Sequence, residues 1–160
     1  MDINAIIESL TKQGLSVATA ESCTGGLIAS TIVDAPGASG CFNEGYVTYS
    51  NEAKMKNLGV KDETLMAFGA VSEQTASEMA QGVMKRAKAD FGLSSTGIAG
   101  PSGGSPSKPV GLVYIGCAYK GGCKVLKLNL KGDRSQVRSQ AAERALELLA
   151  DCLEYKEELA

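Results

Sequence analysis

Apolar and polar positions along the chain follow two different repeats. Ile3, Ile6, Ile7 and Leu10 recur at the spacing of an α-helix, and Gly14 ends this pattern. Other stretches are short, rich in β-branched or aromatic residues and bounded by Gly, Pro or Ser, which is typical of strands. The predicted helices cover residues 3–13, 27–32, 51–59 and 62–68, a longer segment after Ser72, and a last segment from about Arg134. The predicted strands cover residues 15–20, 42–49, 91–98, 110–119 and 123–130.

The order of these segments predicts an α/β fold. Strands alternate with helices, and a short strand, a turn of small residues and a helix follow one another between residues 15 and 32. Gly121 and Gly122 join the last two strands as a hairpin, so at least one strand is antiparallel. We expect a single domain over residues 1–160 with three α/β/α layers and a mixed, mostly parallel sheet of about five strands. Asn51, Asp62 and Ser72 are predicted to cap the helices that follow them.

The composition of the chain narrows the range of functions that it could have. The chain has 160 residues, of which 44% are hydrophobic and 21% charged, and its net charge is −2. These values are typical of a globular domain, and no basic block indicates binding to nucleic acid or to a membrane surface. No signal peptide or transmembrane helix is recognisable, so we expect a cytoplasmic location.

The chain has no histidine and five scattered cysteines without a CxxC pair. A zinc site is therefore not expected, and the cysteines are predicted to be reduced and mostly buried. The lack of histidine also excludes Ser-His-Asp and Cys-His catalysis. If the chain is an enzyme, its acid–base chemistry must come from Lys, Asp, Glu, Tyr or Cys.

The first segment that could carry chemistry is the turn at residues 21–26, between a strand and a helix. Ser22 is placed there as a possible nucleophile, and the backbone amides of Thr24, Gly25 and Gly26 could form an oxyanion hole. The alternative is that Ser22 and Thr24 only cap the helix, and this segment alone favours the alternative.

The second segment holds Tyr49 and Lys54. A lysine near a helix start is usually a solvated charge, but a serine nucleophile needs a base and no histidine is present. Burial could lower the pKa of Lys54 far enough for this task. Tyr49 could hydrogen-bond the serine or the amine, or it could be a packed aromatic residue of the strand.

The third segment is the glycine-rich stretch at residues 94–104. Gly100, Gly103 and Gly104 would let backbone N–H groups approach a phosphate, although a simple connecting loop is equally compatible with the pattern. Arg134 lies at the positive end of the last helix, which suggests an anionic partner, whereas Arg138 is more typical of a structural residue.

Six motifs together resemble the CinA C-terminal domain family, over essentially the whole chain. They are AESCTGG at 20–26, GYVTYSNEAK at 45–54, GAVSEQTASEMA at 69–80, STGIAGPSGG at 95–104, KPVGLVYIG at 108–116 and GDRSQVR at 132–138. The resemblance implies a three-layer α/β/α domain with a mixed five-stranded sheet. It also implies hydrolysis of the carboxamide of nicotinamide mononucleotide to nicotinate mononucleotide and ammonia, in pyridine-nucleotide recycling, without a metal or an organic cofactor.

The resemblance also implies roles for individual residues. Ser22 resembles the family's nucleophile and Lys54 its general base. Tyr49 and Thr96 resemble supporting residues that orient this pair and stabilise the oxyanion, and Arg134 resembles a substrate-binding residue. The expected partner is a small nucleotide, and a homo-oligomer is expected because the family tends to assemble.

Two other functions fit the same sequence. One is a nucleotide-binding accessory module without catalysis, linked to competence or recombination. The other is an amidase for a different small amide. The sequence does not decide between Arg134 and Arg138 as the phosphate ligand.

Overall fold

The computed structural model describes the backbone of residues 1–159 and the side chains of residues 1–155. The helices are Ile3–Gln13 (α1), Leu27–Val33 (α2), Asn51–Leu58 (α3), Asp62–Phe68 (α4), Glu73–Ala87 (α5) and Arg134–Leu159 (α6), with a 3₁₀ turn at Ala38–Gly40 (η1). The strands are Val17–Glu21 (β1), Phe42–Val47 (β2), Phe91–Gly97 (β3), Leu112–Tyr119 (β4) and Gly122–Asn129 (β5). Each predicted helix and strand is present, and the differences lie at the ends: β2 stops at Val47 and β4 begins at Leu112.

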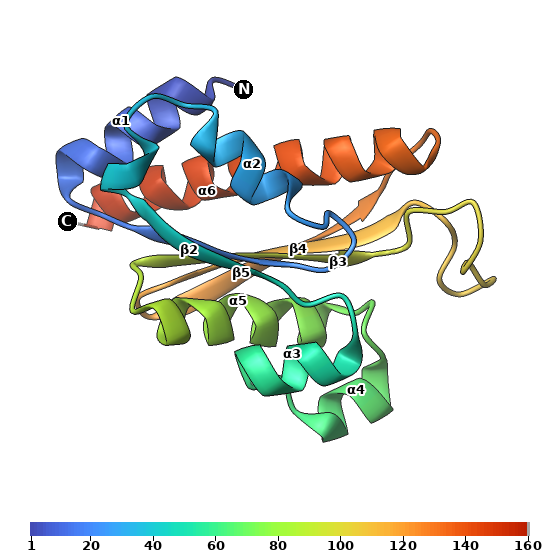
Figure 1. The fold of residues 1–160 in the computed structure, drawn as a ribbon. Coiled ribbons are helices and arrows are strands. Elements are labelled where there is room, and N and C mark those ends of the chain that lie inside the picture. The colour runs from blue at the N-terminus through green and yellow to red at the C-terminus, as the bar shows by residue number, and fades with distance from the viewer. Residues whose placement is uncertain (160) are drawn as a thin grey trace.

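The five strands form one sheet in the order β2-β1-β3-β4-β5. β1 is parallel to β2 and to β3, whereas β4 is antiparallel to β3 and to β5. Four strands therefore run in one direction and β4 runs in the other. Helices α1, α2 and α6 cover one face of the sheet, and α3, α4 and α5 cover the opposite face (Figure 1). The predicted three-layer α/β/α fold with a mixed, mostly parallel sheet is confirmed.

The core is densest where α6 and α5 pack on the two faces of the sheet. The predicted apolar face of α6 is buried, at Val137, Ala141, Ala145, Leu148, Leu149 and Cys152. On the other face, Met79 and Val83 of α5 are fully buried. β3 lies between the two layers, and six of its seven residues are buried, as expected for a central strand.

Two of the three predicted helix caps are wrong. Ser72 caps α5 as predicted, since its hydroxyl accepts a hydrogen bond from the N–H of Thr75. α3 is capped by Ser50 rather than by Asn51, because Ser50 has extended backbone and its hydroxyl accepts from Ala53 at 3.0 Å. α4 begins with Asp62 itself. Its cap position is Lys61, whose N–H donates to the carboxylate of Glu78 on α5, a contact that local sequence does not reveal.

The topology brings three loops to one edge of the sheet. Glu21, the last residue of β1, is level with Val47 of β2 and with Ser95 of β3. The carboxyl ends of these three parallel strands therefore lie side by side, and the segments after them meet outside that edge, where open α/β sheets bind ligands. None of the helices that the structure describes has the length and apolar character needed to span a membrane.

Candidate active site

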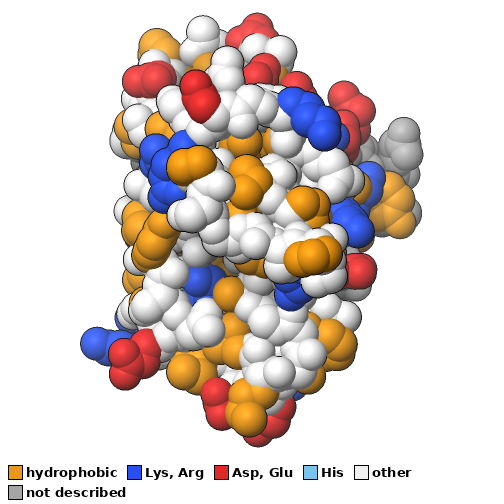
Figure 2. All heavy atoms as spheres, turned by 90° about the vertical axis from the view of Figure 1, so that its right-hand side faces the viewer, with side chains coloured by type: hydrophobic (Ala, Val, Ile, Leu, Met, Phe, Trp, Pro, Cys, Tyr) orange, Lys and Arg blue, Asp and Glu red, His pale blue; other side chains and the backbone are white. Residues whose placement is uncertain are grey.

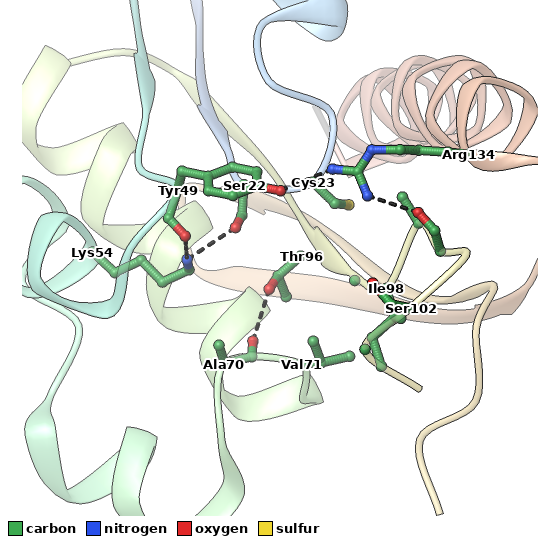
Figure 3. A pocket seen from close by; sticks show the side chains of 14 residues that line it. Ser22, Cys23, Tyr49, Lys54, Ala70, Val71, Thr96, Ile98, Ser102 and Arg134 are labelled. Atoms are coloured by element: carbon green, nitrogen blue, oxygen red, sulfur yellow. Dashed lines mark hydrogen bonds between the residues drawn. The ribbon is translucent and has the colours of Figure 1, made fainter. Parts of the chain in front are cut away.

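The turn after β1 presents Ser22 at this edge. Ser22 extends the pairing of β1 with β3, because its N–H donates to the carbonyl oxygen of Ser95 at 3.0 Å. Gly25 and Gly26 then take positive φ values of 57° and 106°, which favour glycine, and α2 starts at Leu27. The sharp turn leaves the Ser22 side chain pointing into a cavity, away from the sheet (Figure 3).

Lys54 of α3 reaches the same point from the other side. Its side chain is 1% exposed, and its Nζ lies 2.9 Å from Ser22 Oγ. The same nitrogen lies 2.8 Å from the carbonyl oxygen of Thr48. It also lies 3.3 Å from the carbonyl oxygen of Tyr49 (Figure 3). The sequence pairs these residues by elimination and by family resemblance, and the structure places the two atoms in hydrogen-bond contact.

The contacts of Lys54 suit a neutral amine. Burial lowers the pKa of Lys54 to about 8, and no carboxylate among the described residues contacts its Nζ. A neutral amine has two N–H groups, which the carbonyl oxygens of Thr48 and Tyr49 can accept, and one lone pair, which then faces Ser22. Ser22 can donate its hydroxyl proton to that lone pair, so the geometry matches a nucleophile and its general base.

Cys23 is adjacent to Ser22 and also lines the cavity, so it is the competing nucleophile. Burial raises the pKa of the Cys23 thiol to about 11. The reactive form of cysteine is the thiolate, which is therefore scarce at neutral pH. Of Ser22 and Cys23, Ser22 is the residue whose side chain contacts the base, Lys54.

The cavity has a volume of about 340 Å³ and lies outside the carboxyl ends of β1 and β3. Its walls include these residues proposed from the sequence: Ser22, Tyr49, Lys54, Thr96, Gly100, Gly103 and Arg134. Residues that the sequence did not indicate also line it, among them Cys23, Ala70, Val71 and Ser102. No Asp or Glu is part of this lining. Figure 2 looks at this face and shows basic side chains near its middle, with further basic side chains and the acidic ones toward its edges.

The two arginines of α6 have different positions. Arg134 lines the cavity and donates to the carbonyl oxygen of Gly100 at 2.8 Å and to the Tyr49 hydroxyl at 3.0 Å. Arg138 instead donates to the carbonyl oxygens of Cys23 and Thr24, both at 3.0 Å, and so holds the nucleophile turn. Of the two, Arg134 is therefore the one placed to meet an anionic ligand.

Tyr49 and Thr96 line the cavity, but their hydrogen bonds differ from those expected. The Tyr49 hydroxyl meets Arg134, and only its backbone carbonyl oxygen meets Lys54. The Thr96 hydroxyl donates its proton to the carbonyl oxygen of Ala70 at 2.8 Å. As arranged here, Thr96 offers the cavity a hydrogen-bond acceptor, so an oxyanion would need a donor from elsewhere.

Four residues proposed for substrate binding lie away from the cavity lining. The hydroxyl of Thr24 is fully buried behind the turn, and the N–H of Gly25 donates to the carbonyl oxygen of Ser22 at 3.1 Å. Gly26 precedes α2 on the far side of the turn. At Gly104 a Cβ would lie 2.9 Å from the backbone nitrogen of Val110, so close packing of the loop explains the glycine. Besides Ser22, the residue of the turn that lines the cavity is Cys23, whose backbone N–H follows the nucleophile directly.

Within the described part of the chain, no group of three or more His, Cys, Asp or Glu side chains could hold a metal ion. The residues around Ser22 are a hydroxyl, an amine and a guanidinium, together with glycine-rich backbone. These groups can act on a carbonyl compound by nucleophilic attack and proton transfer.

Comparison with known proteins gives one family. The model of the CinA C-terminal domain matches residues 3–153. A CinA-like protein of Kosmotoga olearia is 57% identical over 148 residues, which are 92% of this chain and 36% of that protein. The chain thus spans about a third of the length of the curated relatives it matches.

Solved structures show the same fold. The competence/damage inducible protein CihA of Agrobacterium tumefaciens is 45% identical with a TM-score of 0.92, and the match covers 95% of this chain and 93% of that one. A competence-damaged protein (CinA) superfamily protein of Escherichia coli is 37% identical with a TM-score of 0.89, over 92% of this chain and 86% of that one.

Proposed function

Because this chain belongs to the CinA C-terminal domain family, we propose that it is an amidase that hydrolyses the carboxamide of nicotinamide mononucleotide. The products are nicotinate mononucleotide and ammonia. The observation that carries the proposal is the contact of 2.9 Å between Ser22 Oγ and a fully buried Lys54 Nζ, with a pKa lowered to about 8. A lysine kept at that pKa without a carboxylate partner is costly for stability, and such groups cluster at functional sites.

The reaction uses this pair twice. Ser22 Oγ attacks the carboxamide carbon while its proton passes to Lys54, and the carbonyl oxygen takes the negative charge. Lys54 then returns the proton to the amide nitrogen, the C–N bond breaks and ammonia leaves, so that Ser22 carries an acyl ester. Water attacks this ester with Lys54 again as base, which releases the carboxylate and restores the serine hydroxyl.

The substrate's charges fit the charges of the cavity. Arg134 lines the cavity, and its guanidinium has N–H groups beyond those that bind Gly100 and Tyr49, which suits binding of the phosphate. Gly100 and Gly103 bring backbone to the wall of the same cavity. The positive pyridinium ring makes the carboxamide carbon more electrophilic. The N–H of Cys23 follows the nucleophile in the chain, where acyl-transfer enzymes commonly place an oxyanion donor.

The test is ammonia release from nicotinamide mononucleotide by the purified chain. Ser22→Ala and Lys54→Met should each abolish turnover. Lys56→Met is the matched control, because it makes the same change on the same helix at an exposed position, and it should leave turnover unchanged.

Each result has a distinct meaning. Ammonia released from other amides, but not from this nucleotide, would indicate an amidase with another substrate. Ligand binding without any turnover would indicate the nucleotide-binding module. Turnover that survives Ser22→Ala would refute the serine–lysine mechanism.

A further inference from the structure

Glu21 is a fully buried carboxylate that the reaction does not use. It precedes Ser22 in the chain and is 1% exposed. Its two oxygens accept hydrogen bonds from the backbone N–H of Ile28 at 2.8 Å and of Ala29 at 3.0 Å, in the first turn of α2. Glu21 Oε1 also accepts the hydroxyl proton of Thr24 at 2.7 Å. The start of α2 is thus saturated by a side chain from inside the protein.

Thr24 extends this interaction to the next strand. Its Oγ1 lies 2.6 Å from Ser95 Oγ. Since a carboxylate only accepts, the single proton of the Thr24 hydroxyl goes to Glu21, and Ser95 must donate to Thr24. A directed chain of hydrogen bonds runs from Ser95 through Thr24 to Glu21, and each member is at most 1% exposed. Chains of this kind strengthen when all members are satisfied.

The chain of hydrogen bonds encloses the nucleophile. Glu21 and Thr24 flank Ser22 and Cys23 in sequence, and the N–H of Ser22 itself is bound to the carbonyl oxygen of Ser95. We propose that Glu21, acting through Thr24 and Ser95, is a positioning residue that holds Ser22 Oγ in line with Lys54. This inference rests on the proposed function only in taking Ser22 as the nucleophile.

The structure offers a matched pair of substitutions. Thr24→Val removes the hydroxyl that links Glu21 to Ser95 and keeps the shape of the side chain. Thr19→Val makes the same change at another buried position of this segment, where the hydroxyl has no hydrogen-bond partner among the described residues. Thr24→Ser keeps the hydroxyl and should restore the wild-type behaviour.

Two readouts are measured with each variant. One is kcat and KM for ammonia release, normalised to active sites. The other is the rate at which a fluorophosphonate modifies Ser22, where the serine oxygen displaces fluoride from phosphorus, which needs no natural substrate. We expect Thr24→Val to lower kcat and the labelling rate by about ten- to a hundredfold, as small displacements of reacting groups do, with KM nearly unchanged. Thr19→Val and Thr24→Ser should stay within about threefold of wild type.

The outcomes separate this inference from the proposed function. Slow labelling of Thr24→Val supports positioning even if the wild-type chain releases no ammonia from nicotinamide mononucleotide, which would refute the function alone. Wild-type kcat per active site and wild-type labelling in a folded Thr24→Val protein would overturn the inference. If that variant does not fold, Ser95→Ala, which removes the far end of the chain of hydrogen bonds, must show the same slow labelling.

Discussion

The buried lysine should make the protein less stable at neutral pH than a variant without it. Lys54→Met replaces the amine by an apolar side chain of similar length. In the folded protein burial lowers the pKa of Lys54 to about 8, from its ordinary value of 10.5. Below about pH 8 the group is protonated in both the folded and the unfolded chain, so folding must bury a charge.

The size of this effect follows from the shift. The unfolded chain binds the additional proton between about pH 8 and 10.5, and stability rises with pH wherever the unfolded state binds more protons. The lowered pKa corresponds to roughly 3 kcal/mol of stability, absent below about pH 8 and recovered by about pH 10.5. For a domain of this size that is roughly 6–12 °C in Tm. The Met side chain loses the hydrogen bonds to Thr48 and Tyr49, but this loss does not depend on pH.

The measurement is urea unfolding of the wild type and of Lys54→Met at about pH 7 and about pH 10. The free energy of unfolding of the variant minus that of the wild type should fall by roughly 2–3 kcal/mol between the two pH values. Other titrating groups cancel in this difference. Lys56→Met, at an exposed position, should show no such change. A Lys54→Met difference that is the same at both pH values would refute the claim that burial lowers the pKa of this amine.

Three further predictions concern the site. Because only neutral Lys54 has a free lone pair, kcat/KM should rise tenfold per pH unit below about 8 and level off above it, and a flat profile would exclude Lys54 as the base. Gly100→Ala should lower activity, because φ is +85° and the new Cβ would lie 2.5 Å from Val110 Cγ1. The control is Gly14→Ala, where φ is +66° and no atom lies within 4 Å of the new Cβ; it should only lower the free energy of unfolding in urea by about 1 kcal/mol. Equal kinetics for the two variants would contradict this prediction. Iodoacetamide should modify the half-buried Cys123 well before Cys23, because burial raises the pKa of the Cys23 thiol to about 11. Peptide mass spectrometry measures the two modification rates. Faster modification of Cys23 would contradict the claim that its thiol is unreactive.

The fold could be predicted because its signals are local and periodic. The spacing of apolar residues in α6 and the Gly-Gly pair at the turn from β4 into β5 are signals that depend on nearby residues alone. The caps that failed show the limit of this reasoning. The cap position of α4 is Lys61, whose N–H is held by Glu78, 17 positions later in the chain, and no local pattern links the two.

The site could be predicted only in part, for the same reason. The lack of histidine and the family resemblance together predict the pairing of Ser22 with Lys54, and the contact between them spans 32 positions. The sequence does not predict the direction of a hydrogen bond. Long-range packing makes Thr96 donate to Ala70 and turns the Thr24 side chain inward. The sequence does not indicate Glu21, because an acidic residue before a serine has no distinctive signal of its own.

The position of Glu21 also explains how Lys54 keeps its lowered pKa. A carboxylate beside Lys54 would favour the protonated amine and remove the base. Consecutive residues of a strand point to opposite faces, so Glu21 and Ser22 diverge at the end of β1. Glu21 turns to α2, whose N–H groups hold its charge on one face of the sheet, while Ser22 turns to Lys54 on the other. The same three hydrogen bonds that fix the nucleophile turn therefore hold the Glu21 carboxylate away from the amine, so that burial is the largest influence on the pKa of Lys54 and lowers it.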